Sequence, residues 1–243
     1  MQNLLIPNKK KISIVIPCYN PADGWCKALM NNMRELNEQL RIYDVQYIVS
    51  NDGSTKINEG SVRSVSKFSN LTFLNNIQNQ GKGSAIRKGT ALADGEIIIY
   101  VDLDFPFGVS SIVNMVREFE KDPDCQFIYG NRVGGYFKKL PLKRQFVSRV
   151  LHGINRLFLS KTITDTQAGI KGLRSELKED VLTTKTNTFV FEIELIRKLI
   201  KKKVVIKSVD VSAIPSIVFT DFSSKVLFHE ALSLSRILYA SMF

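Results

Sequence analysis

The chain has 243 residues, 44% of them hydrophobic and 23% charged, which is typical of a globular protein with a packed core. The formal net charge is +11, and residues 137–243 hold nearly all of the excess, with 19 Lys and Arg against 9 Asp and Glu. This asymmetry favours an anionic partner for the second half of the chain. The sequence has no run of about 18 apolar residues, which excludes an evident membrane-spanning helix.

The cysteines and the first residues bear on the compartment. Cys18, Cys26 and Cys125 have no metal-ligand spacing and cannot form an even disulfide framework, which favours a reducing environment. The apolar stretch in the opening MQNLLIPNKKK is too short for a signal peptide. We therefore expect a cytoplasmic protein.

Strands and helices are expected to alternate over the first 130 residues. The strands are β-branched apolar runs, and the helices repeat apolar residues every three or four positions. The expected elements are a strand at 12–17, a helix at 23–41, a strand at 45–50, a helix at 58–68, a strand at 71–74, a loop and helix at 75–95, a strand at 96–102, a helix at 110–121 and a strand at 126–130. This alternation predicts an α/β fold with a Rossmann-like, mostly parallel sheet and helices on both faces.

The second half is expected to extend the same domain. Its predicted elements are a basic helix at 143–160, a turn, strand and helix start at 165–176, a helix at 189–202, a strand at 204–211 and a helical tail at 225–243. No repeat or low-complexity linker separates the halves. We predict one domain over 1–243, with a first half at 10–136 and a basic C-terminal helical elaboration at 137–243.

Polar residues directly follow three of the predicted strands. They are Tyr19 and Asn20, Asn51 and Asp52, and the pair Asp102 and Asp104. Ligands of parallel α/β sheets bind beyond the carboxyl ends of the strands, so these clusters are expected at one edge. Two carboxylates at a strand end can both reach Mg²⁺ or Mn²⁺, and such a cation neutralises charge on a departing diphosphate. The alternative is a strand that runs into a polar turn.

The glycine-containing segment NQGKGSAIRKG spans residues 79–89. A P-loop would need glycine where Asn76 stands, and a dinucleotide fingerprint would need glycine where Ile86 stands. ATP hydrolysis and nicotinamide binding are therefore disfavoured. Lys82 could offer a positive charge to a phosphate, and the alternative is a plain turn that opens a helix.

Seven segments occur in the order and spacing of family 2 glycosyltransferases. They are VIPCYN, VSNDGST, NQGKGSAIRKG, EIIIYVDLD, YGNR, LKRQFVSR and DTQAGIKGL. Each is weak evidence alone, but seven in order are strong evidence. The chain most resembles polyprenyl-phosphate (dolichyl-phosphate type) glucosyl- and mannosyltransferases, and the resemblance covers roughly residues 10–240. The resemblance implies a GT-A nucleotide-diphospho-sugar transferase fold. It also implies inverting transfer of a hexosyl group from a UDP- or GDP-linked sugar to a polyprenyl phosphate.

The resemblance also assigns residues to the nucleotide sugar. Those that match nucleotide-contacting positions are Pro17, Tyr19, Asn20, Asn51, Asp52, Gly81, Lys82 and Gly83. Asp102 and Asp104 match the D-x-D motif and are the implied metal ligands, with Asp104 the more direct one and a catalytic residue. The implied cofactor is Mg²⁺ or Mn²⁺.

A second group of matches concerns the acceptor. The residues implied to bind it are Arg132, Arg144, Ser148, Arg149, Gln167 and Lys225. Arg132 is also implied in catalysis beside a phosphate, together with Asp165, which shares the loop motif D-x-x-x-G with Gly169.

The chain departs from the family pattern at several positions, and an arginine that usually stands shortly before the late Ser-Lys pair has no clear counterpart. Pro21 stands where an acid usually follows the first loop, Asn51 replaces one member of an acidic pair, and Pro106 stands where mannosyl-type relatives carry a polar ligand. An inactive relative that acts as an assembly partner is therefore kept as an alternative.

The acceptor decides whether a general base is needed. An acceptor phosphate is already ionised, whereas an alcohol acceptor, such as a sugar hydroxyl in polysaccharide synthesis, requires a base. Asp165 is the best candidate for that base, and a turn or helix cap is its alternative role. His152 and His229 are expected to be structural.

The basic second half favours a lipid phosphate and a membrane surface as partners. Arg144, Arg149 and Arg156 lie at helical spacing, and the planar fork of arginine suits phosphate. The tail 225–243 could lie in a membrane interface or pack on its own domain. Nucleic acid is not expected, because the aromatic residues do not interleave with the basic ones. We expect the protein at the inner face of a membrane.

Overall fold

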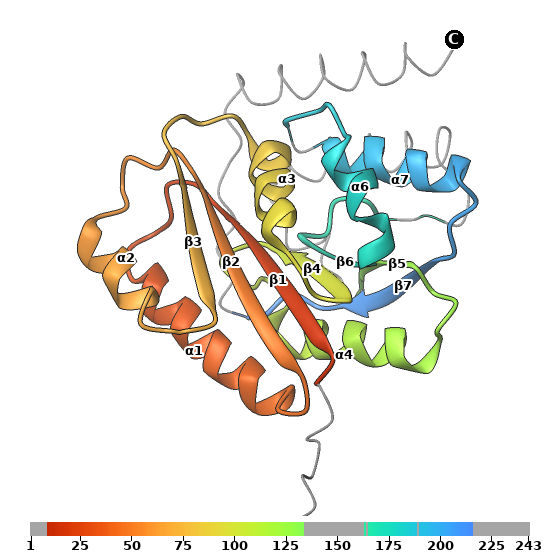
Figure 1. The fold of residues 1–243 in the computed structure, drawn as a ribbon, viewed down its shortest axis with the longest axis horizontal. Coiled ribbons are helices and arrows are strands. Elements are labelled where there is room, and N and C mark those ends of the chain that lie inside the picture. The colour runs from red at the N-terminus through yellow and green to blue at the C-terminus, as the bar shows by residue number, and fades with distance from the viewer. Residues whose placement is uncertain (1–8, 134–162, 164, 189, 216–243) are drawn as a thin grey trace, which may run out of the picture.

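The computed structural model describes residues 9–133, 163, 165–188 and 190–215. Within that part, seven strands form one sheet in the order β3-β2-β1-β4-β6-β5-β7 (Figure 1). The strands are β1 (Lys11–Cys18), β2 (Asp44–Asp52), β3 (Leu71–Asn76), β4 (Ile97–Val101), β5 (Phe127–Arg132), β6 (Ile170–Arg174) and β7 (Ile206–Val211). The helices are α1 (Trp25–Gln39), α2 (Glu59–Val65), α3 (Lys82–Leu92), α4 (Gly108–Lys121), α6 (Lys178–Leu182) and α7 (Phe191–Lys201), with a 3₁₀ turn at Ser175–Leu177.

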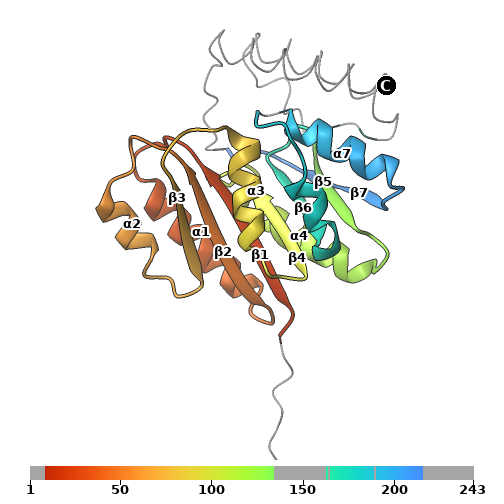
Figure 2. The same cartoon turned by 45° about the horizontal axis from the view of Figure 1, so that its top comes forward.

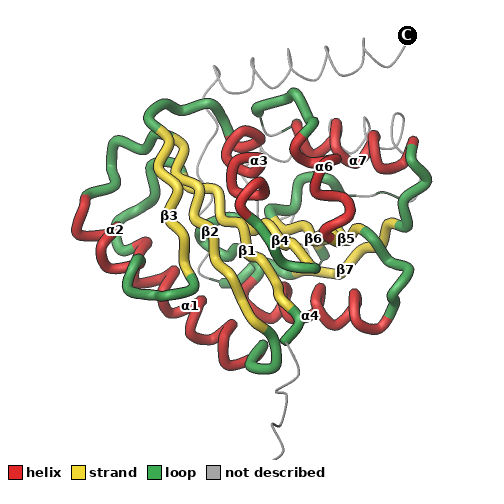
Figure 3. The backbone as a smooth tube through the Cα atoms, viewed as in Figure 1, coloured by secondary structure: helices red, strands yellow, loops and turns green. Residues whose placement is uncertain are grey.

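The sheet is covered by helices on both faces, as the alternating pattern predicts (Figures 2 and 3). Successive residues of β1 serve different cores, because side chains alternate across a strand. Ile14 and Ile16 belong to the cluster that contains the buried residues of α1 and α4, whereas Val15 belongs to the cluster with those of α3, α6 and α7. Burying each of these side chains contributes roughly 1.5–3 kcal/mol.

Helix α1 illustrates how the sequence pattern sets the packing. Leu29, Met33 and Leu36 are spaced four and three residues apart, lie on one stripe and are fully buried. The stripe packs in the same core as the odd-numbered residues of β4, such as Ile97 and Ile99. The N-terminal half of the prediction is confirmed, with element ends that shift by a few residues.

Strand β6 is the one antiparallel member of the described sheet. It pairs antiparallel with β4 on one side and with β5 on the other, while β5 runs parallel to β7. Because Ile170 stands opposite Val101, the residues that precede β6 lie at the carboxyl end of β4. The C-terminal half thus completes the sheet and delivers residues 165–169 to the edge where ligands of such sheets bind.

Several predictions fall on residues outside the described part. These are the helices at 143–160 and 225–243, and they stay predictions, as does the division of the chain at residue 136. No helix among the described residues is long and apolar enough to cross a membrane.

Candidate active site

The carboxyl ends of β1, β2 and β4 share one edge of the sheet. In the parallel register, Cys18 stands opposite Asn51, and Val15 stands opposite Tyr100 of β4. The polar clusters that follow these strands are therefore neighbours, as predicted from the sequence.

A tight turn presents Asp102 and Asp104 at the end of β4. The amide of Phe105 donates to the carbonyl of Asp102 at 2.9 Å, and Phe105 has a positive φ of 45°. Phe105 and Phe107 are buried and anchor the turn in the core. The Asp102 side chain is 37% exposed, and Asp104 is exposed. Desolvation by the surrounding protein, reinforced by the charge of Asp102, raises the pKa of Asp104.

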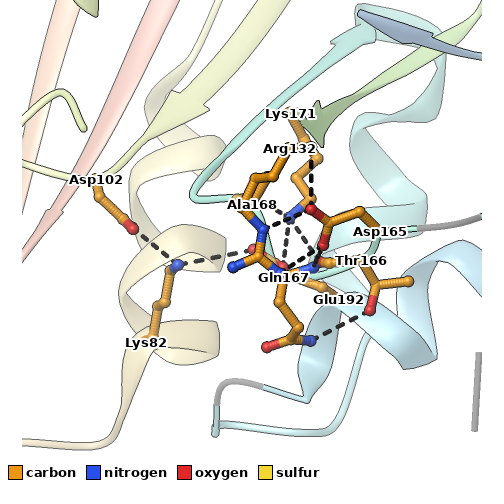
Figure 4. A network of polar contacts seen from close by, with 9 residues as sticks. All are labelled: Lys82, Asp102, Arg132, Asp165, Thr166, Gln167, Ala168, Lys171 and Glu192. Atoms are coloured by element: carbon orange, nitrogen blue, oxygen red, sulfur yellow. Dashed lines mark hydrogen bonds and ion pairs between the residues drawn. The ribbon is translucent and has the colours of Figure 1, made fainter. Parts of the chain in front are cut away.

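The first residue of α3, Lys82, reaches the Asp102 carboxylate. Its Nζ lies 2.8 Å from Oδ1 of Asp102 and 3.7 Å from Oε1 of Glu192 in α7 (Figure 4). Burial acts to lower the pKa of Lys82, but the charges of Asp102 and Glu192 outweigh it and raise the pKa above the ordinary lysine value. Lys82 is therefore charged, and it faces the aspartate rather than projecting as a free cation toward solvent.

Behind this pair, Lys171 and Glu192 form a second ion pair inside the protein. Lys171 is fully buried, Glu192 is 2% exposed, and Lys171 Nζ lies 2.5 Å from Glu192 Oε2. Lys171 also donates to the backbone carbonyls of Thr166 and Ala168 (Figure 4). Burial lowers the pKa of Lys171. Neither residue was predicted from the sequence, although a lysine within the apolar strand IKGL and an acid within FVFEI are visible signals.

Asp165 and Arg132 are joined by two charge-assisted hydrogen bonds. Arg132 donates from Nε at 2.5 Å and from Nη2 at 2.8 Å, in a bidentate arrangement. Asp165 also accepts from the backbone amides of Arg132 and Gln167 at 3.2 Å and 3.0 Å. Burial acts to raise the pKa of Asp165, but the hydrogen bonds and charge of Arg132 outweigh it and lower the pKa. A buried carboxylate with these partners is a weak base.

Asp52 and Asn51 fix the loop that leads into α3. Asp52 is 2% exposed and accepts from the amide of Gln80 at 3.1 Å and from that of Gly81 at 2.7 Å. Asn51 is also buried, and its side-chain amide donates to Asn75 Oδ1 at 2.6 Å. Both residues stand at the expected edge, and their contacts in the described structure are structural.

Asn20 fastens the loop after β1 to the loop after β2. It has a positive φ of 43°, and its Oδ1 accepts from the amide of Thr55 at 2.9 Å. Next to it, the side chain of Tyr19 is 54% exposed, whereas Pro17 is partly buried at the end of β1. The loop therefore holds an aromatic ring open to solvent at the rim of the site.

Gly81 and Gly83 allow the chain at residues 186 and 187 to pack on the start of α3. A Cβ on Gly81 would lie 2.4 Å from the carbonyl oxygen of Asn187, and one on Gly83 would lie 2.5 Å from that of Thr186. The amide of Gly83 donates to the Asn187 carbonyl at 2.8 Å. These glycines thus have a packing role, and their place beside a nucleotide stays a prediction.

The described residues contain Arg132 and Gln167 from the predicted acceptor site. Arg144, Ser148, Arg149 and Lys225 lie outside the described residues. Within the described part there is no group of three or more His, Cys, Asp or Glu side chains that could hold a metal ion. Asp102 and Asp104 form a pair, which suits a cation that takes its other ligands from phosphate oxygens and water.

Comparison with known proteins identifies the family. The chain matches the model for glycosyl transferase family 2 over residues 13–182, a stretch that runs from β1 to α6 and includes the D-x-D turn. The chain belongs to glycosyl transferase family 2. The match confirms the resemblance drawn from the seven segments.

Three similar curated proteins carry names that refer to dolichyl or dolichol phosphate. A dolichyl-phosphate beta-glucosyltransferase of Trichomonas vaginalis is 27% identical over 172 residues, covering 68% of this chain and 53% of the relative. That of Dictyostelium discoideum is 25% identical, covering 79% and 64%. A dolichol-phosphate mannosyltransferase of Pyrococcus furiosus is 24% identical, covering 79% and 53%. This family 2 chain thus spans about half to two thirds of their lengths.

Solved structures confirm the GT-A fold. A glucosyl-3-phosphoglycerate synthase of Mycobacterium tuberculosis, in complex with Mn²⁺, UDP and glucosyl-3-phosphoglycerate, matches this family 2 chain with a TM-score of 0.68. The match covers 95% of this chain and 79% of that chain at 18% identity. A likeness at this level of identity concerns the fold alone.

Proposed function

We propose that this chain transfers a hexosyl group from a nucleotide-diphosphate sugar to a polyprenyl phosphate by inverting displacement. The observation that carries the proposal is the accessible pair Asp102 and Asp104 at the end of β4, next to the loop at 165–169. The protein's task in such a reaction is to align donor and acceptor and to stabilise charge on the departing nucleoside diphosphate. The names of the family 2 relatives support the acceptor class.

Asp102 and Asp104 are the proposed ligands of a divalent cation. Carboxylate oxygens suit Mg²⁺ and Mn²⁺, and Gly169 leaves room for the Asp102 carboxylate, since a Cβ there would stand 1.9 Å from Oδ2. A bound cation neutralises charge on the leaving diphosphate. Support comes from the solved relative that holds Mn²⁺ together with UDP.

The nucleotide is proposed to bind across the carboxyl ends of β1 and β2. The exposed ring of Tyr19 offers a face on which a base can stack. The side chains of Asn20, Asn51 and Asp52 hold the surrounding loops in place through the hydrogen bonds described above. Pro17, Gly81 and Gly83 are the remaining proposed nucleotide contacts.

A phosphate acceptor fits the state of Asp165 better than a hydroxyl acceptor. Asp165 already accepts two hydrogen bonds from the side chain of Arg132, and its pKa is lowered, so it is a poor base. An ionised lipid phosphate needs no base. Arg132 and Gln167, and the undescribed residues Arg144, Ser148, Arg149 and Lys225, are the proposed acceptor contacts. The basic second half suits docking to an anionic membrane surface.

The test is sugar transfer by the purified chain. UDP-glucose and GDP-mannose are each tested as donors in the presence of Mn²⁺ or Mg²⁺. For each donor, the rate of transfer to a short-chain polyprenyl phosphate is compared with the rate of transfer to free sugars. We expect lipid-linked product with one donor, loss of turnover by more than about 100-fold in Asp104→Asn, and no loss in Asp124→Asn, an exposed aspartate outside the site. Transfer to a free sugar instead would show that the acceptor is a sugar hydroxyl and not a lipid phosphate. No turnover with any pair of substrates would favour the alternative that the chain is an inactive relative.

A further inference from the structure

Lys82 lies between the carboxylates of Asp102 and Glu192 and is closer to that of Asp102. Its Nζ is at ion-pair distance from Asp102, 2.8 Å, but stands 3.7 Å from Oε1 of Glu192. Among the described residues, none donates a hydrogen bond to the buried Glu192 Oε1, whereas Oε2 of the same carboxylate is paired with Lys171 (Figure 4). A buried carboxylate oxygen without a hydrogen-bond partner is costly, so its presence beside the candidate metal ligands calls for a role.

We propose that Lys82 is a counter-ion shared between Asp102 and Glu192, and that it moves onto Glu192 when a divalent cation binds Asp102. The inference rests on the metal site proposed above and adds two residues that control it. Lys82 and Glu192 act on the cation through Asp102, so both are positioning residues.

The geometry allows this exchange with a small movement. The Lys82 ammonium needs to move by about 1 Å to hydrogen-bond Glu192 Oε1, and the flexible four-carbon stem of lysine permits that. Glu192 itself is held by Lys171, whose Nζ is also fixed by the carbonyls of Thr166 and Ala168. The lysine therefore moves while the glutamate stays in place.

Charge balance favours the same direction of movement. The network holds two ammonium groups, on Lys82 and Lys171, against the carboxylates of the partly exposed Asp102 and the buried Glu192. A divalent cation at Asp102 repels the Lys82 ammonium, while Glu192 Oε1 attracts it at close range. The charge of Asp104 also attracts Lys82 when no cation is bound, and that attraction weakens once Asp104 binds the same cation as Asp102.

The two residues should affect cation binding in opposite directions. Lys82→Met removes the ammonium that competes for Asp102, so Mn²⁺ affinity, measured by titration calorimetry without substrate, should rise about fivefold. Glu192→Gln removes the carboxylate that receives Lys82, so the lysine stays on Asp102 and Mn²⁺ affinity should fall about threefold. A purely structural role for both residues would lower the affinity in both variants.

Controls separate this exchange from general effects of charge and folding. Lys88→Met removes the same charge from the same helix six residues on, where Lys88 forms no ion pair with any residue that the structure describes, and should leave Mn²⁺ affinity within about twofold. The double variant Lys82→Met/Glu192→Gln should bind Mn²⁺ like Lys82→Met, because Glu192 acts through Lys82. Thermal unfolding of each variant shows that it is folded, and Lys82→Met keeps the test decisive if Glu192→Gln does not fold.

A crystal structure of the wild-type chain with Mn²⁺ gives the direct reading. We expect the distance from Lys82 Nζ to Glu192 Oε1 to shorten from 3.7 Å to hydrogen-bond length. Mn²⁺ on Asp102 with Lys82 still at 2.8 Å from that carboxylate would overturn the inference, as would affinities that change in the same direction in both variants. Failure of the wild-type chain to bind Mn²⁺ would overturn the proposed metal site as well. Mn²⁺ binding without movement of Lys82 would overturn the counter-ion exchange alone, so the two failures are distinguishable.

Discussion

The backbone amide of Asp102 donates a hydrogen bond of 3.0 Å to the carbonyl oxygen of Gly169, and the carboxylate of Asp102 lies over the same glycine. A Cβ on Gly169 would stand 1.9 Å from Oδ2 of Asp102, a distance that no side chain tolerates. The end of β4 and the loop before β6 therefore fit together only with glycine at this position. The contact joins the D-x-D turn to the segment that carries Asp165 and Gln167.

Gly169→Ala is expected to impair sugar transfer by displacing Asp102. The added methyl group forces the carboxylate or the loop to move by about 1 Å, and a shift of that size costs about 100-fold in rate. The measurement is kcat/KM for transfer together with Mn²⁺ affinity, and both should fall.

The matched control for this substitution is Gly60→Ala in α2. Gly60 is an exposed helical glycine, and among the described residues a Cβ there meets the Asn58 side chain alone, at 3.3 Å. Transfer activity should be unchanged, because alanine is well tolerated in a helix. Equal loss of activity in both variants would contradict the role given to Gly169.

Asp165→Asn tests the buried ion pair with Arg132. Removing one charge leaves the guanidinium without its bidentate partner, and we expect the free energy of unfolding to fall by about 3 kcal/mol at pH 7. Urea unfolding measures it, with Asp124→Asn as the control, because Asp124 is exposed. If Asp165→Asn had the same free energy of unfolding as the wild type, the ion pair of Asp165 and Arg132 would not stabilise the fold.

The same pair predicts how stability depends on pH. Arg132 lowers the pKa of Asp165 in the folded protein, so its contribution is complete above the unfolded-state value of about 4 and is lost as the pH falls through the folded-state value. The difference in unfolding free energy between wild type and Asp165→Asn should stay constant from about pH 7 to 5 and shrink below about pH 4. A difference that persists unchanged into strong acid would be inconsistent with this assignment.

The parts of the site that follow one strand were predictable from the sequence. The run EIIIYV marks β4 because it is apolar and β-branched, and Asp102 and Asp104 follow it directly. The ion-pair network of Lys171 and Glu192 behind these aspartates was not predictable. It depends on β6 lying antiparallel between β4 and β5, and no local sequence pattern indicates that β6 pairs with β4, about 70 residues earlier in the chain. Lys82 was expected to offer charge to a phosphate, and only the close approach of the first residues of α3 and α7 places it between Asp102 and Glu192.

Lys171→Met should destabilise the protein more than a combined change at both ends of its ion pair. The single substitution leaves Glu192 buried without its closest positive charge, at an expected cost of about 3 kcal/mol in unfolding free energy. Lys171→Met/Glu192→Met removes both charges and should recover at least about 1 kcal/mol, although the carbonyls of Thr166 and Ala168 still lose a donor. Thermal or urea unfolding of the double-mutant cycle measures the coupling, and strictly additive losses would contradict it.

Tyr19→Ala should weaken nucleotide binding without affecting the fold. Tyr19 is 54% exposed, so removing its ring costs little packing. A base stacked on the ring would lose about 1–3 kcal/mol, or about 5- to 150-fold in affinity. Tyr19→Phe keeps the aromatic face and should bind UDP or GDP as the wild type does, which separates stacking from a hydrogen bond made by the hydroxyl. Calorimetry with both nucleotides, in the presence of Mn²⁺, measures the change. Loss of affinity in Tyr19→Phe equal to that in Tyr19→Ala would assign the contact to the hydroxyl, and unchanged affinity in both would place the base away from the loop after β1.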